Sequence, residues 1–260
     1  MVDKISNLFW RVLRHPRPYR ATIADFFWRR RNPESAYPAY GYCVESGAAL
    51  AKALGYPGIT VIEFGVAGGN GLVALEQHAS AAERAYGLTI DVVGFDSGIG
   101  LPETGDYRDL PYRFSRGFYP MDPDKLRARL KRAHVELGQI SDTLPRFGAT
   151  CRFPIGVVLI DLDYYSSTKS AFAIFDVAPT LPRVPVYFDD LWLATQFTGE
   201  WAAIRDYNDA HPTQKIAQTW ALAHGQRWES QVFEWHKFDH PDYCRLLASE
   251  ITQGRLPLRD

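Results

Sequence analysis

Short apolar runs alternate along this chain with longer segments that carry helix or turn signals. Several runs are rich in Val, Ile and Phe without interruption, which is typical of strands buried on both faces of a parallel sheet. The expected strands are residues 59–64, 89–95, 135–137, 155–160, 184–188, 215–223 and 230–238. Between them, Asp122 and Pro123 form a helix start, with a capping aspartate and a proline in the first turn. The alternation predicts an α/β fold with a doubly wound, mostly parallel seven-stranded sheet.

The first strand leads into the most informative stretch, Glu63-Phe-Gly-Val-Ala-Gly-Gly-Asn-Gly71. Its glycines let the backbone turn sharply and approach a ligand without Cβ atoms in the way. Helix follows from Leu72. A strand, a glycine-rich turn and a helix N-terminus together form a site for a small polar molecule at the carboxyl end of a parallel sheet. A turn that only connects strand and helix is the alternative for this stretch taken alone.

Details of this turn narrow the class of ligand. A nucleoside triphosphate site would need a Lys-Ser or Lys-Thr pair at the start of the helix, where the chain has Asn70-Gly71-Leu72. A dinucleotide pattern fits only from Gly69, several residues past the strand end, which counts against a nicotinamide cofactor. The carboxylate of Glu63 would repel a pyrophosphate but suits a cofactor with an amine or sulfonium charge.

Composition describes an ordinary globular protein. The net charge is -1 and 46% of the 260 residues are hydrophobic, which argues against a nucleic-acid binder and favours small-molecule partners. The cysteines Cys43, Cys151 and Cys244 are far apart and without a C-x-x-C pair, so we expect reduced thiols. No apolar run is long enough to span a bilayer, and no signal peptide is evident, so we expect a cytoplasmic protein.

Residues 1–32 differ from the rest, with eight basic residues against two acidic ones and many aromatic residues between them. Two short amphipathic helices on either side of His15-Pro-Arg-Pro18 fit this pattern. Such a segment can lie on an anionic membrane surface, or pack on the protein body or on a second subunit of a homodimer, and we favour packing. Residues 33–42 are expected to be a loop and residues 44–54 a helix. We therefore divide the chain into an N-terminal helical extension, residues 1–55, and a cofactor-binding catalytic domain, residues 56–260.

Polar residues at other strand ends extend the predicted pocket. Asp96 ends the second strand, where a carboxylate can hold the two hydroxyls of a ribose. Capping the next turn is its alternative role. Ser141 and Asp142 follow the third strand, within reach of a bound adenine. Residues 97–122 show no periodicity and carry many glycines, prolines and aromatic rings, so we expect a lid or a substrate wall.

Three carboxylates end two neighbouring strands of the predicted sheet: Asp161 follows the fourth strand, and Asp189 and Asp190 follow the fifth. Parallel strands deliver their ends to one edge, so these acids should converge beside the cofactor. Grouped carboxylates repel one another unless a cation compensates, and an all-oxygen set is what Mg²⁺ prefers. In the alternative, Asp163 and Asp190 face solvent and cap helices.

At this point the chain resembles the class I S-adenosylmethionine-dependent methyltransferases, and within them the macrocin O-methyltransferase family of metal-dependent sugar methylases. Residues 63–69 are similar to its first motif, and Phe95-Asp-Ser97 with Gly100-Leu-Pro102 to its "FDS…GLP" segment. Further matches, in the family's order, are Asp142-Thr-Leu-Pro145 with "DTLP", Asp161-x-Asp163-x-Tyr165-x-Ser167-Thr168 with "DxDxYxST", and Asp189-Asp190 with the paired metal-binding aspartates.

The resemblance implies a role for each matching residue. It implies a Rossmann-like methyltransferase fold, S-adenosylmethionine as cofactor and Mg²⁺ on Asp161, Asp189 and Asp190. The implied cofactor contacts are Glu63, Gly65, Val66 and Gly69 at the methionine end, Asp96 and Ser97 at the ribose, and Ser141 and Asp142 at the adenine. The chain departs from the family at Pro182-Arg-Val-Pro185 and at Leu191, on the acceptor side of the site.

The expected function is transfer of a methyl group to a hydroxyl of a small molecule, such as a sugar or a glycosylated natural product. Asp161 is the first candidate for removing the hydroxyl proton. Two alternatives stay open: a nicotinamide-dependent oxidoreductase, and a non-catalytic module with a vestigial cofactor pocket.

Overall fold

The computed structural model describes residues 37–191, 193–219, 231–245 and 247. The strands are β1 (Gly58–Phe64), β2 (Thr89–Asp96), β3 (His134–Leu137), β4 (Ile155–Ile160), β5 (Arg183–Phe188), β6 (Gln214–Gln218) and β7 (Val232–Lys237). The helices are α3 (Pro38–Leu54), α4 (Asn70–Tyr86), α5 (Pro123–Arg129), α6 (Ile140–Thr150), α7 (Tyr165–Ala171), α8 (Ile174–Val177) and α9 (Gly199–Ala210), with a 3-10 turn, η1 (Tyr107–Asp109).

The strands form one seven-stranded sheet in the order β3-β2-β1-β4-β5-β7-β6. The pairs from β3 to β5 are parallel, whereas β7 is antiparallel to both β5 and β6. Along the central strands, Phe64 lies beside Phe95 and Ile160, and Ile160 lies beside Phe188. The four central strands therefore end at the same level. The predicted doubly wound, mostly parallel sheet is confirmed.

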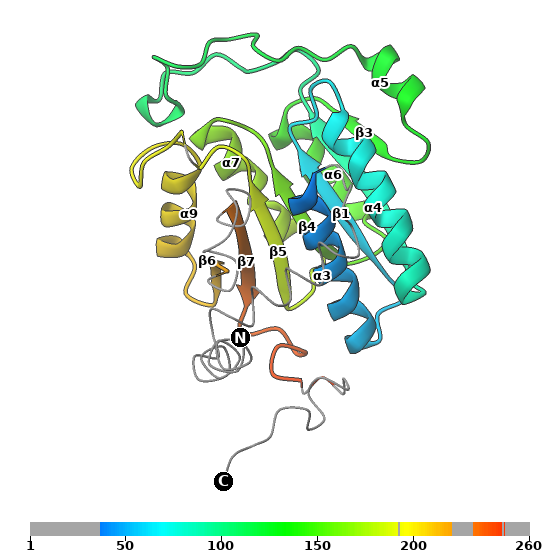
Figure 1. Ribbon diagram of the computed structural model, residues 1–260. Helices are drawn as coiled ribbons and strands as arrows, with labels where there is room; N and C mark the ends of the chain where they lie inside the picture. The colour runs from blue at the N-terminus through cyan, green and yellow to red at the C-terminus, as the bar shows by residue number, and fades with distance from the viewer. Residues whose placement is uncertain (1–36, 192, 220–230, 246, 248–260) are drawn as a thin grey trace, which may run out of the picture.

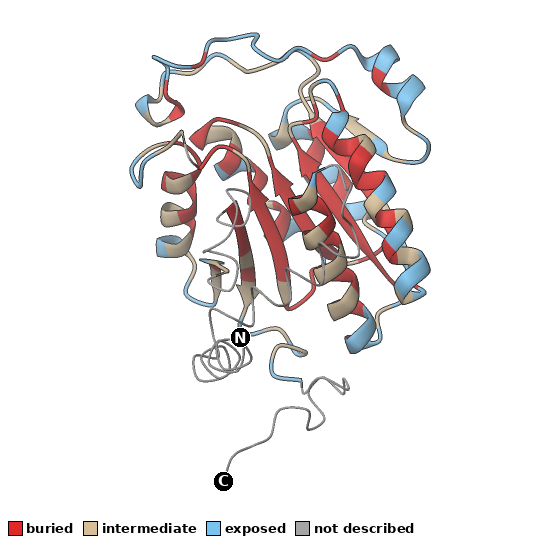
Figure 2. Ribbon diagram, in the orientation of Figure 1, coloured by how far each residue is buried: buried red, intermediate tan, exposed pale blue. Residues whose placement is uncertain are grey.

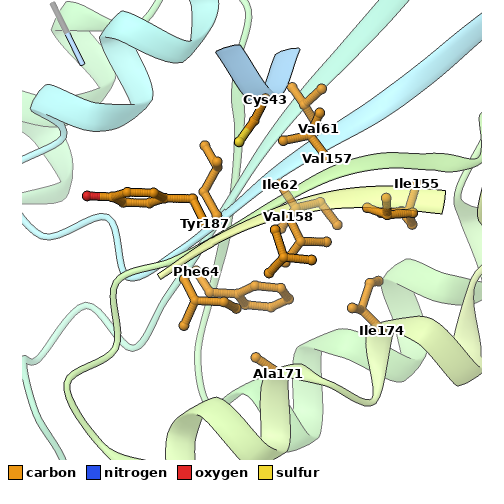
Figure 3. Packing of buried hydrophobic residues seen from close by; sticks show 14 of the residues in the cluster. Cys43, Val61, Ile62, Phe64, Ile155, Val157, Val158, Ala171, Ile174 and Tyr187 are labelled. Atoms are coloured by element: carbon orange, nitrogen blue, oxygen red, sulfur yellow. The ribbon is translucent and has the colours of Figure 1, made fainter. Parts of the chain in front are cut away.

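Helices cover both faces of the sheet (Figure 1). Helices α3 and α4 pack together on one face, and α6, α7 and α8 pack together on the other. Figure 3 shows the sheet between them: Cys43 of α3 lies on one side of the strands, and Ala171 and Ile174 lie on the other. Figure 2 shows the result, a sheet that is buried along most of its length and helices that expose only their outer faces.

Helix α3 lies close against the middle of the sheet. A Cβ atom on Gly47 would lie 2.5 Å from the carbonyl oxygen of Gly156 in β4, so only glycine permits this approach. The helix ends at Gly55, in the left-handed conformation, as predicted. It begins at Pro38, however, so the prediction of a loop over residues 33–42 is wrong for the last five of them. Proline suits the first turn of a helix, where its missing N–H has no partner.

Two further boundaries differ from the prediction. Residues 140–150 form helix α6, with Pro145 inside it, so Ser141 and Asp142 lie in a first helical turn and not on a strand end. The sequence also favours Ser167 or its neighbour as the cap of the next helix, whereas helix α7 begins at Tyr165 and has Tyr164 at its N-cap position.

The basic aromatic segment 1–32 and its two predicted helices lie outside the described residues, as does part of each predicted C-terminal strand. Within the part of the chain that the structure describes, none of the helices has the length and apolar character needed to cross a membrane.

Candidate active site

A cavity of about 290 Å³ opens at the carboxyl ends of the four central strands. It lies under residues 97–122, which cross the top of the molecule in Figure 1 and contain η1 as their one regular element. Each central strand contributes to its wall: Gly65 and Ala67 follow β1, Phe95, Asp96 and Ser97 lie at the end of β2, Asp161, Leu162 and Asp163 follow β4, and Asp189 and Asp190 follow β5.

The glycine-rich turn passes directly over the end of β4. Gly65 has a φ of 87°, in the left-handed region. A Cβ atom there would lie 1.7 Å from the carbonyl oxygen of Asp161. The turn and the acid at the end of β4 can be this close only because residue 65 is glycine. The predicted cofactor turn thus contacts the predicted metal ligand.

Asp96 organises the same turn from the side of β2. Its Oδ2 accepts the backbone N–H groups of Val66 and Ala67, each at 2.9 Å, and its Oδ1 accepts that of Gly98 at 2.7 Å. Oδ1 keeps one lone pair for a ligand hydroxyl. The alternative role of Asp96, binding the following turn, is therefore confirmed. Asp96 also lines the cavity, and its contact with a ribose stays a prediction. Val66 itself is not among the lining residues, whereas Ser97 is.

Glu63 lies near the end of β1, is 2% exposed and is not among the residues that line the cavity. The Tyr40 hydroxyl donates to its Oε1 at 2.7 Å, and its Oε2 has no partner among the described residues. Burial raises the pKa of this carboxyl well above its ordinary value. Gly69 also lies outside the cavity wall, where it faces Leu126 of α5.

The predicted adenine contacts lie in helix α6. Ser141 and Asp142 are exposed, and the residues of this segment that line the cavity are Gly138, Gln139 and Ile140. The role of Ser141 and Asp142 stays a prediction.

The structure brings the three predicted acids together. One oxygen from each of Asp161, Asp189 and Asp190 lies within 4.8 Å of the other two, and all three residues line the cavity. The backbone N–H of Asp190 donates to Glu200 of α9 at 3.0 Å. Burial and the neighbouring carboxylates raise the pKa of Asp161 to about 8. Mutual repulsion of the grouped carboxylates contributes to this raised pKa, and a hard cation would favour their ionised forms.

Asp163 is a site residue that the sequence analysis left out. It is 7% exposed, lines the cavity and has a φ of 58°, which is uncommon outside glycine. Burial, the charge of Asp190 and a hydrogen bond with Asp190 raise its pKa to about 9. The alternative in which Asp163 and Asp190 face solvent is wrong, since both are buried. The two-residue spacing from Asp161 was the available signal.

Two aromatic residues line the cavity from the segment 97–122, which we call the lid. Phe118 and Tyr119 line it together with the acids, yet they are 45% and 53% exposed. Their rings meet edge to face with centroids 6.1 Å apart. The lid therefore presents a partly open aromatic wall opposite the carboxylates.

No family model matches the chain, and no curated protein sequence matches it. Among solved structures, the calicheamicin methyltransferase CalS11 is similar with 20% identity and a TM-score of 0.51, over 92% of this chain and 93% of that one. An apo structure of CalS11, named as a TDP-rhamnose 3'-O-methyltransferase of calicheamicin biosynthesis, has 20% identity and a TM-score of 0.45, over 92% and 94%. An O-methyltransferase from Bacillus cereus in complex with SAH has 16% identity and a TM-score of 0.41, over 85% and 91%.

At 20% identity, the likeness to CalS11 shows that the two chains share a fold. The chain has the Rossmann-like α/β fold of the class I methyltransferases.

Proposed function

We propose that this protein is an S-adenosylmethionine-dependent methyltransferase that transfers a methyl group to a hydroxyl of a small molecule, with Mg²⁺ held by Asp161, Asp189 and Asp190. The observation that carries the proposal is the shared cavity, in which a glycine-rich turn and Asp96 lie beside a cluster of three carboxylates. The fold shared with a calicheamicin methyltransferase supports the same reaction class.

The cofactor arm of the site comprises the turn after β1 and the end of β2. The free lone pair on Asp96 Oδ1 would accept a ribose hydroxyl, and Ser97 and Gln139 line the same wall. A methionine ammonium bound at the turn would favour the ionised form of Glu63, whose Oε2 is buried and unpartnered among the described residues. Gly65, Val66 and Gly69 shape the turn, and Ser141 and Asp142 are proposed near the adenine.

The metal arm fits a divalent ion by its donor chemistry, because three carboxylates offer oxygens to one point in a partly buried cavity. A bound divalent ion would lower the pKa of the acceptor hydroxyl and hold its oxygen in line with the methyl group. The protein's own contribution is to fix the carboxylates and to accept the proton, for which Asp161 is our first candidate and Asp163 the second. The carbon–sulfur bond breaks as the carbon–oxygen bond forms, which leaves S-adenosylhomocysteine and a methyl ether.

The acceptor would lie between the acids and the lid. Phe118 and Tyr119 offer ring faces and edges, on which a sugar or an aromatic natural product can stack. We therefore propose a sugar, a glycosylated natural product or a similar hydroxylated molecule as the acceptor.

Two expectations complete the proposal. Cys43, Cys151 and Cys244 are all free thiols, which supports a reducing compartment such as the cytoplasm. A homodimer formed through residues 1–32, with a membrane surface as the alternative contact, also stays a proposal.

Calorimetry with S-adenosylhomocysteine and, separately, with NAD⁺ and NADH tests the cofactor class. We expect binding of S-adenosylhomocysteine alone. Binding of a nicotinamide cofactor would favour the oxidoreductase alternative, which the antiparallel β7 inside the sheet already disfavours. Incubation with methyl-labelled cofactor and a panel of hydroxylated acceptors, read by mass spectrometry, then tests turnover. Absence of turnover with every acceptor would favour the non-catalytic module.

A further inference from the structure

Tyr187 is a buried residue of β5 whose polar end reaches the acid cluster. Its hydroxyl donates to Asp189 Oδ1 at 2.5 Å, and the residue is 7% exposed. Figure 3 shows its ring leaving the apolar cluster with the hydroxyl pointing away from the other labelled side chains. The ring is thus anchored in the core while its hydroxyl binds a carboxylate at the sheet edge.

A second tyrosine fixes the position of that ring. Tyr40 of α3 meets Tyr187 edge to face, with ring centroids 5.6 Å apart and an interplanar angle of 69°. The Tyr40 hydroxyl is itself bound to Glu63. This contact and the burial of the ring restrict where the Tyr187 hydroxyl lies, so little rotational freedom is left to lose when a ligand binds.

The hydrogen bond from Tyr187 engages one oxygen of Asp189, and among the described residues no donor to its other oxygen is seen. The bond also restrains rotation of the carboxylate. The backbone around Asp189 is held as well, because the Gln231 amide donates to the carbonyl oxygens of Phe188 and Asp189. Donors of this kind behind a metal ligand orient the ligand and raise the affinity of the site.

We propose that Tyr187 is the positioning residue of Asp189: its hydroxyl holds one carboxylate oxygen so that the other points at a divalent cation. This inference rests on the metal site of the proposed function. Loss of the hydroxyl should weaken cation binding by roughly 10- to 100-fold, which is the usual effect of removing a hydrogen-bond partner of a metal ligand.

The experiment compares two conservative variants. Tyr187→Phe removes the hydroxyl and keeps the ring. Tyr56→Phe is the matched control, because the Tyr56 hydroxyl also donates to a carboxylate, that of Asp242 at 2.8 Å, but Tyr56 precedes β1 at the other end of the sheet. Mn²⁺ affinity is measured from the electron paramagnetic resonance signal of the free ion, and Tm is measured with and without Mn²⁺. We expect Tyr187→Phe to lose Mn²⁺ affinity and the Mn²⁺-induced rise in Tm, and Tyr56→Phe to keep both.

Each other outcome overturns the inference. Wild-type Mn²⁺ affinity in Tyr187→Phe, with a lower Tm, would make the hydroxyl purely structural. Equal loss in both variants would indicate a global effect. A wild-type protein that binds S-adenosylhomocysteine but no Mn²⁺ would refute the metal site and this inference with it. Wild-type Mn²⁺ affinity in Tyr187→Phe would instead refute this inference alone and leave the proposed function intact.

A further measurement needs no change at residue 187. Mn²⁺ binding to the wild-type protein should perturb the ultraviolet absorption of tyrosine, because the cation draws on the carboxylate that Tyr187 binds. The perturbation should persist in Tyr119→Phe, which removes the tyrosine of the lid wall. A spectrum that Mn²⁺ leaves unchanged would contradict the inference.

Discussion

The Asp109 carboxylate accepts both the backbone N–H and the hydroxyl of Ser166, each at 2.8 Å. Asp109 lies in the lid and is fully buried, while Ser166 lies in the first turn of α7. Within the lid, the Thr104 hydroxyl also donates a hydrogen bond to the Asp109 carboxylate. This one carboxylate therefore fastens the lid to the body of the protein and accepts one of the backbone N–H groups at the start of helix α7.

We expect Asp109→Ala to release the lid. It removes three hydrogen bonds from a buried carboxylate and should cost about 2–4 kcal/mol of stability. Trypsin should then cleave faster after Arg113 and Arg116, which lie exposed in the same segment. Ser166→Ala, which removes one of the bonds, should lose about 1 kcal/mol. Equal cleavage of wild type and Asp109→Ala would contradict the anchoring role.

Gly65 and Gly68 form a matched pair for testing the turn. Gly65→Ala places a Cβ atom 1.7 Å from the Asp161 carbonyl oxygen at a φ of 87°, and should cost about 3 kcal/mol or more. Gly68→Ala meets no atom within 4 Å and should stay within about 0.5 kcal/mol of wild type. Urea unfolding of both variants measures the difference. Similar midpoints for the two would mean that the turn differs from the one described.

Loss of the metal site should abolish methyl transfer but leave cofactor binding almost unchanged. We expect Asp189→Ala to lose methyl transfer. Its Mn²⁺ affinity should fall by more than the roughly 10- to 100-fold that is typical when a hydrogen-bond partner of a metal ligand is removed, because Asp189 is itself a proposed ligand. Affinity for S-adenosylhomocysteine, measured by calorimetry, should stay within a few-fold. Asp124→Ala, on the exposed face of α5, serves as the control. Chelation should abolish wild-type activity and Mg²⁺ should restore it, so full activity of Asp189→Ala under chelation would refute the metal role.

His236 in β7 should make the protein less stable in mild acid. Burial and the charge of Arg183 lower the pKa of His236, and its Nδ1 lies 2.9 Å from the Tyr243 hydroxyl. A lowered pKa means that the native state favours the neutral ring, so the stabilisation is complete above the ordinary pKa of about 6.5 and is lost as the pH falls through the lowered value. Tm measured between pH 7.5 and 5 should fall less steeply in His236→Gln. His134→Gln, at an exposed position, should keep the wild-type slope.

The three cysteines should differ sharply in reactivity. Cys43 is fully buried under α3, where burial raises the pKa of its thiol, whereas Cys244 is exposed. Figure 3 shows the Cys43 sulfur directed at the strands. A thiol reagent should label Cys244 quickly, the half-buried Cys151 slowly, and Cys43 only after unfolding. Mass spectrometry of the labelled peptides gives the order, and rapid labelling of Cys43 would contradict the packing of α3.

The strands could be predicted because their signal is local. A buried parallel strand needs an unbroken apolar run, and residues 155–160 supply one from end to end. The convergence of Asp161, Asp189 and Asp190 followed from topology, since parallel strands end on one edge.

The predictions were wrong where the local sequence fits two kinds of structure. Residues 138–145 carry a glycine and a proline at their ends, both typical of loops, yet they enter a helix. Asp163 looked like a helix cap and is a buried acid, and nothing near Asp109 or Tyr187 signals a partner. Asp109 and Ser166 are 57 positions apart, and such a contact appears only once the chain is folded.

Helix α3 contacts β1, β4 and β5, although it precedes all of them in the chain. A ribosome therefore delivers this helix long before Phe188 completes the surface on which it packs. Until then the buried side of α3, including Cys43 and Val44, lacks the partners that β4 and β5 supply and is available to chaperones or to aggregation. Such non-local packing also predicts slow refolding of the isolated protein.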